Sequence, residues 1–108
     1  MFTPKLQTSQ TDMLIKALVA LNEPEDAYRF LEDVLTIQEL KSIAQRLHVA
    51  WLLRERVTYQ EIARRTGAST ATISRVNRAL LCGAGGYQKV LDAFSEMGML
   101  PPAGETQD

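Results

Sequence analysis

The segment from Thr58 to Leu81 constrains the fold most, because it holds two short helical patterns separated by a tight turn. The run "TYQE" at its start predicts a capping box, in which the Thr58 hydroxyl accepts a backbone N–H and Glu61 reaches back. The run "TGAS" then breaks the pattern. Gly67 suits the left-handed backbone that ends a helix, and Ser69 suits the start of the next. The segment therefore predicts a helix over 59–65, a turn, and a second helix ending at Leu81.

The rest of the chain also has helical patterns, and no segment alternates as a half-buried strand would. We expect helices over 12–21, from Pro24 to Leu35, from the capping box "TIQE" at Thr36 to about Arg54, and over 87–97. This predicts an all-α fold of about six helices, with a single domain over 1–97 and a flexible tail over 98–108. The third helix should turn five residues toward the core: Leu40, Ile43, Leu47, Ala50 and Trp51.

The composition excludes several classes of function. Cys82 is the only cysteine and His48 the only histidine, so an internal disulfide is impossible and neither a zinc site nor Cys–His catalysis is expected. Paired carboxylates and cofactor loops are absent, so we expect no enzyme, no metal and no cofactor. No apolar run reaches the ~20 residues of a membrane helix, and the N-terminus lacks the pattern of a secretion signal. We expect a cytoplasmic protein that does not bind membranes.

The charges are unevenly distributed, although the net charge is only −1. Residues 54–78 carry six arginines against two glutamates, whereas residues 1–39 carry three basic and seven acidic side chains. A basic block in an otherwise acidic chain favours a localised anionic partner, of which nucleic acid is the commonest. Composition alone leaves open a solvated arginine-bearing surface.

The basic block coincides with the two short helices, which indicates a helix-turn-helix over residues 58–81. Ile62 and Ala63 face inward on the first helix, and Ile73, Val76 and Leu80 form the inward stripe of the second. The second helix of such a motif lies in the DNA major groove, where small polar side chains let its axis approach the bases. We expect double-stranded DNA to contact these residues: Tyr59, Gln60, Arg64, Arg65, Ser69, Thr70, Ala71, Thr72, Ser74, Arg75 and Arg78.

The sequence resembles the tryptophan-repressor superfamily, most closely its YerC/YecD-like branch. The resemblance rests on "LTIQELKSIAQRLHVAWLLRERVTYQEIARRTGASTATISRVNRAL" and "GGYQKVLDAF", and "TGASTATISRVNR" is its most specific part. It implies an intertwined homodimer of six-helix chains that reads a near-palindromic operator as a repressor. Apolar side chains of the first two helices, together with Val90, Leu91 and Phe94, could supply the surface for the second chain.

The resemblance also implies a ligand site, because the tryptophan repressor binds its corepressor between the third helix and the recognition helix. Thr36, Arg46 and Arg75 match the positions that contribute to that site. The repressor has a glycine after its recognition-helix arginine, where this chain has Val76, whose side chain would fill space that the indole needs. We therefore expect that tryptophan is not the corepressor and leave any effector unidentified. For Arg46 we favour an ion pair on the helix surface, and for Arg75 a DNA contact.

These observations predict a sequence-specific transcriptional regulator. Two other interpretations remain open at this point. The polar surface of the second helix could simply face solvent in a helical hairpin. Alternatively, the helix-turn-helix could act as an adaptor that binds a protein of the transcription machinery instead of a specific DNA site.

Overall fold

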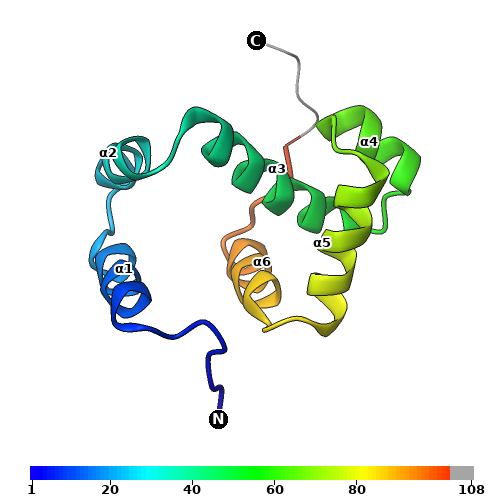
Figure 1. Ribbon diagram of the computed structural model, residues 1–108. Coiled ribbons are helices and arrows are strands. Elements are labelled where there is room, and N and C mark those ends of the chain that lie inside the picture. Colours follow the sequence, from blue (N-terminus) through cyan, green and yellow to red (C-terminus); the bar gives the residue numbers. More distant parts are fainter. Residues whose placement is uncertain (103–108) are drawn as a thin grey trace. The chain divides into compact units, whose positions relative to one another are not determined.

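The computed structural model describes residues 1–102, which form six α-helices and no β-strand (Figure 1). This confirms the predicted all-α fold. The chain divides into two compact units, one from Met1 to Leu40 and one that begins at Lys41. The helices are α1 (Ser9–Ala20), α2 (Pro24–Val34), α3 (Ile37–Arg54), α4 (Tyr59–Thr66), α5 (Thr70–Cys82) and α6 (Gly86–Glu96).

The first unit is built from helices that are stabilised locally. Helix α1 starts three residues earlier than expected because Thr8 and Thr11 cap it reciprocally: the Thr8 hydroxyl accepts from the N–H of Thr11, and the Thr11 hydroxyl accepts from the N–H of Thr8. Pro24 occupies the first turn of α2, as predicted. Neither helix contains a buried residue. Several large apolar side chains of α1 and α2 are instead exposed: Met13, Leu14, Ile15, Leu18, Val19, Tyr28 and Val34.

The capping box at the start of α3 is confirmed. The N–H of Thr36 donates to Glu39 Oε1 at 2.9 Å, and the N–H of Glu39 donates to the Thr36 hydroxyl at 3.0 Å. The end of α3 was not foreseen in detail. Arg56 adopts a left-handed conformation with φ of 65°, and the N–H of Val57 returns to the carbonyl of Leu52 at 3.0 Å. This is the geometry in which a glycine commonly ends a helix.

The core of the second unit encloses the second half of α3. Four consecutive residues, Val49 to Leu52, are buried, which means that this part of the helix is covered on every side. The core is completed from α4, α5 and α6, and the rings of Trp51 and Phe94 lie 4.7 Å apart. The prediction was wrong for Ile43, which is 49 % exposed. It also missed Val49 and Leu52, because a helix that is covered all round does not show which of its apolar stripes is the inner one.

The segment after α6 folds back onto the unit. The N–H of Met99 donates to the carbonyl of Phe94 at 3.0 Å, and His48 Nε2 lies 3.2 Å from the carbonyl oxygen of Pro102. The tail predicted over 98–108 thus begins with residues that have defined contacts, and its remainder, 103–108, lies outside the described residues. Among the helices of residues 1–102, none combines the length and apolar character needed to cross a membrane.

Candidate nucleic-acid interface

The α4–turn–α5 unit forms as the sequence predicts, with each helix one residue longer than expected. The Thr58 hydroxyl accepts from the N–H of Glu61 at 3.2 Å and starts α4. Gly67 ends α4 in the left-handed conformation, with φ of 75°. Ser69 then starts α5, its hydroxyl accepting from the N–H of Thr72 at 3.1 Å. The turn between the helices is therefore only three residues long, as a helix-turn-helix requires.

Helix α5 has one buried stripe and one exposed polar surface. Ile73, Val76 and Leu80 are 0 %, 2 % and 8 % exposed, so they anchor the helix to the core. Ala68 in the turn is buried as well, which the sequence analysis did not anticipate. On the opposite side the helix presents Thr70, Ala71, Ser74, Arg75 and Arg78 to solvent. Apart from Leu81 in the last turn, the exposed positions of α5 carry no bulky apolar side chain, so its first turns can approach the edges of base pairs closely.

The structure places nine of the eleven predicted DNA-contact residues at exposed positions, and the other two, Arg65 and Thr72, are half-buried. Thr72 is also committed locally, because its hydroxyl accepts a hydrogen bond from that of Ser69 at 3.1 Å. Tyr59 and Gln60 are exposed in the first turn of α4. Because α4 and α5 pack directly on each other, these residues belong to one folded unit.

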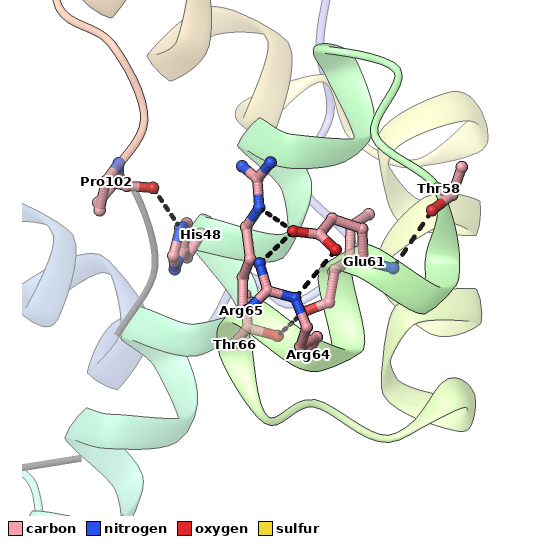
Figure 2. A network of polar contacts seen from close by, with 8 residues as sticks. His48, Thr58, Glu61, Arg64, Arg65, Thr66 and Pro102 are labelled. Carbon is pink, nitrogen blue, oxygen red and sulfur yellow. Dashed lines mark hydrogen bonds and ion pairs between the residues drawn. The ribbon is translucent and has the colours of Figure 1, made fainter. Parts of the chain in front are cut away.

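The four arginines of the motif fall into two pairs with different surroundings. Within residues 1–102, Arg75 and Arg78 on α5 form no ion pair. Arg64 and Arg65 on α4 both donate to the carboxylate of Glu61, Arg64 Nε at 3.0 Å and Arg65 Nε at 2.8 Å (Figure 2). Of these four arginines, only the two on α5 are therefore without a carboxylate partner among the described residues.

This arrangement corrects the predicted role of Glu61. Its backbone N–H is capped by Thr58 as expected, but its carboxylate turns to the arginines and does not complete the capping box. Hydrogen bonds from Arg64, which have the larger effect, and from Arg65 lower the pKa of Glu61 from 4.5 to about 2. The hydrogen bond to Glu61 in turn raises the pKa of Arg64. Glu61 and Arg64 thus stabilise each other's charged forms.

A hydrogen bond that the sequence analysis missed attaches the motif to α3. The side-chain amide of Gln45 donates to the carbonyl of Thr66 at 3.0 Å, and the Thr66 hydroxyl donates to the carbonyl of Ile62 at 2.8 Å. Helix ends leave carbonyl groups without partners, and Gln45 satisfies one of them. A glutamine 21 positions away carries no local signal of this role in the sequence.

Gln45 also lines a cleft of about 380 Å³ between α3, α5 and α6. Arg46 and Arg75 line the same cleft, which is consistent with two of the three ligand positions that the resemblance implied. Thr36 lies in the first unit, where its hydroxyl caps α3. The ion pair favoured for Arg46 is not formed with any residue of 1–102. The full lining is Ser42, Gln45, Arg46, Thr72, Arg75, Val76, Ala79 and Tyr87.

The side chains that commonly hold metal ions or act as nucleophiles are scattered in the described part of the chain. Residues 1–102 contain no group of three or more histidine, cysteine, aspartate or glutamate side chains placed to hold a metal ion. Cys82 is exposed at the end of α5, and His48 contacts the backbone of Pro102. The helix-turn-helix and the adjoining cleft are therefore the features of the second unit from which a function can be argued.

Comparisons with known proteins agree with this geometry. A family model described as Trp repressor protein matches residues 9–95. YerC of Bacillus subtilis (strain 168), a protein of uncharacterised function, is 48 % identical over 92 residues, which are 85 % of this chain and 88 % of YerC.

Two crystal structures match with a TM-score of 0.80 each. One is a TrpR-like protein from Eubacterium eligens ATCC 27750, with 50 % identity over 91 % of this chain and 98 % of that one. The other is a proposed Trp repressor from Staphylococcus aureus, with 39 % identity over 91 % of this chain and 95 % of that one. The fold, the helix-turn-helix and these matches together show that the chain belongs to the Trp repressor family.

Proposed function

We propose that this protein is a sequence-specific transcriptional repressor that acts in the cytoplasm and binds a near-palindromic DNA operator as a homodimer. The observation that carries the proposal is the exposed surface of α5, a helix fixed to the core by its buried stripe. This surface presents small polar side chains and two arginines that form no ion pair within residues 1–102. A helix of this kind can enter the major groove without rearranging the core. The proposal assigns the protein no catalytic activity.

Each exposed side chain has a role that follows from its chemistry. Arg75 and Arg78 can donate to guanine or phosphate, whereas Thr70 and Ser74 can exchange hydrogen bonds with base edges. The methyl group of Ala71 can contact a thymine methyl. The side chains of α4 suit the DNA backbone, which positions a protein without identifying the sequence.

The exposed apolar side chains of the first unit support the homodimer. Contiguous apolar surface on a water-soluble protein marks a surface for association, and α1 and α2 bury none of their residues in the single chain. One correction applies to the surface expected from α6. Val90 is 42 % exposed and available, but Leu91 is 1 % exposed and belongs to the core of its own chain. A two-fold dimer would place two copies of α5 about 34 Å apart, one turn of DNA.

The surroundings of Val76 support a regulator that does not use tryptophan. Val76 lines the cleft and is only 2 % exposed, so its side chain occupies space beside Arg75 that a planar indole would need. Titration of the purified protein with tryptophan in a calorimeter should show no saturable heat at micromolar concentrations. A micromolar, saturable isotherm would contradict this part of the proposal.

The experiment that tests the function is in vitro selection from a randomised duplex pool, at near-physiological salt and without added ligand. Enrichment of an inverted repeat is expected, because a symmetric dimer reads two half-sites. If nothing enriches, the selection is repeated with a cell metabolite extract, which would reveal a required effector. Failure in both conditions would favour an adaptor that binds a protein partner.

Replacing Arg75 tests the role of the recognition helix directly. If Arg75 makes a bidentate base contact, Arg75→Ala should weaken binding to the selected operator by about 1–3 kcal/mol and relax the preference at one base pair. The matched control is Lys89→Ala, which removes the same charge from α6. Equal weakening on every duplex would assign Arg75 to phosphate.

A further inference from the structure

In helix α4, the carboxylate of Glu61 competes with external anions for the arginines of the same helix. Glu61 lies one turn before Arg64 and Arg65, so its carboxylate meets both guanidinium groups on the same helix surface (Figure 2). The side chains of Glu61, Arg64 and Arg65 are 33 %, 70 % and 29 % exposed. Arg64 is therefore open to solvent, whereas Glu61 and Arg65 are half-buried, and an external anion can reach the cluster at Arg64.

A phosphate group and a carboxylate use the same donors of an arginine side chain. Glu61 accepts from Nε and Nη2 of Arg64 and from Nε of Arg65, and the three charged groups together contribute a single net positive charge to the surface of α4. The arginines of α5 carry no such neutralising partner within residues 1–102. The two helices of the motif thus differ in how readily they accept the DNA backbone.

We propose that Glu61 limits binding to the DNA backbone, because its carboxylate occupies the Nε donors of Arg64 and Arg65 with which a phosphate would otherwise make paired contacts. This inference rests on the proposed DNA-binding function, and it assigns to Glu61 the control of binding to non-specific DNA. Phosphate contacts supply essentially all of the affinity for random DNA. Glu61 therefore weakens random binding through α4 while leaving the base contacts of α5 unchanged, which shortens the time spent on wrong sites.

The test compares Glu61→Gln with Glu55→Gln. Both variants gain one unit of charge inside the basic block, but Glu55 forms no ion pair with residues 1–102. Binding to a fluorescent random-sequence duplex is followed by anisotropy between about 50 and 200 mM salt. Glu61→Gln should bind about 3- to 10-fold more tightly, as expected for releasing two ion pairs at the protein surface. The slope of log affinity against log salt should steepen by about 1 for each new phosphate contact.

A thermodynamic cycle separates competition from simple repulsion. The gain in DNA affinity from Glu61→Gln should disappear when Arg64 and Arg65 are both replaced by Gln, because the carboxylate then has no arginine to bind. A gain that persists without the arginines would show that Glu61 merely repels phosphate, and the proposal would be overturned. Circular dichroism of each variant confirms that α4 is folded, since glutamine forms helices about as well as glutamate.

A measurement on the unaltered protein gives an independent result. The Nε–Hε NMR resonances of Arg64 and Arg65 should shift when duplex is added, as the guanidinium groups change partner from carboxylate to phosphate. Binding without any shift would overturn the proposal for Glu61 alone. If the unaltered protein binds no duplex at low salt, the proposed function fails together with this inference. If it binds but Glu61→Gln behaves like Glu55→Gln, the function stands and only the role of Glu61 is wrong.

Discussion

The two units of this chain differ in how far they bury their apolar side chains. Within residues 41–102, the second unit buries ten hydrophobic residues, with Leu52, Ile62 and Ile73 among those fully removed from solvent. In α1 and α2 of the first unit no residue is buried. The unit that carries the helix-turn-helix therefore has a core of its own, whereas the two N-terminal helices still have apolar surface to cover.

The difference shows which interactions hold each unit. Helices α1 and α2 are supported by the Thr8 cap, by Pro24 and by the ion pair between Arg29 and Glu25, all of them local. Local interactions of these kinds contribute about 0.3–1 kcal/mol each, much less than a packed core provides. The first unit is therefore expected to need association with another apolar surface to keep a stable arrangement in solution. The second unit is expected to be stable through its own core.

The largest expected effect comes from removing core volume from one unit only. Leu52→Ala should lower the free energy of unfolding by about 2–5 kcal/mol, because Leu52 is fully buried and its loss leaves a cavity. The matched change Leu18→Ala, at a 41 % exposed position, should cost much less when the protein is dilute enough to be monomeric. Urea denaturation followed by circular dichroism measures both. Equal losses would show that the contrast between the units does not exist in solution.

A second prediction addresses association through the first unit. Leu18→Glu places a charge on the exposed apolar surface of α1 and should raise the dissociation constant of the proposed dimer at least ~10-fold, as expected from the loss of one buried leucine. Sedimentation equilibrium measures the constant. The same substitution at Leu81, which is 70 % exposed on α5, serves as the control. A dimer unaffected by Leu18→Glu would place the interface elsewhere.

A third prediction concerns a substitution that should make the second unit more stable and so increase the difference in stability between the units. Arg56 holds a left-handed conformation, which costs an L-residue about 1–2 kcal/mol, and glycine avoids that cost. Since glycine also loses more entropy on folding, Arg56→Gly should gain about 0.5–1 kcal/mol. A rise in the urea midpoint at unchanged slope would support this. Destabilisation would mean that the Arg56 side chain contributes more than its backbone costs.

The smallest expected effect is the acid titration of Glu61. Its pKa is lowered in the folded state, so its contribution to stability is complete above the ordinary value of 4.5 and is lost as the pH falls toward about 2. The carboxyl resonance of Glu61 should therefore titrate near 2 by NMR. In Arg64→Gln the midpoint should move up toward 4.5, because the largest cause of the shift is gone. An unchanged midpoint would exclude Arg64 as that cause.

Helix boundaries were predictable from the sequence because they depend on neighbouring residues. The caps at Thr36, Thr58, Gly67 and Ser69 all form where the patterns placed them. The early start of α1 was missed because Thr11 takes the place that glutamate or glutamine has in the usual capping box. Cap chemistry thus identifies a boundary only when the residue types are the common ones.

Interactions between distant segments were the part that could not be predicted. The hydrogen bond from Gln45 to Thr66 and the burial of Val49 depend on how the helices pack. The site shows the same limit at short range. Glu61 was assigned to the cap, but two arginines within one turn offer a carboxylate stronger, charge-assisted partners than a backbone N–H. The sequence was sufficient to locate the charged side chains of α4. Which partner the Glu61 carboxylate binds depends on side-chain geometry, which the sequence does not show.

The contact between His48 and the carbonyl of Pro102 has a practical consequence for the construction of assays. Gln45, which holds the end of α4, lies one helical turn before His48 on α3. A fluorophore or affinity tag fused after Asp108 would therefore join the chain six residues beyond a point fixed next to the helix-turn-helix. A tag that is cleaved off before binding assays keeps added bulk away from Pro102 and from the neighbouring helix-turn-helix.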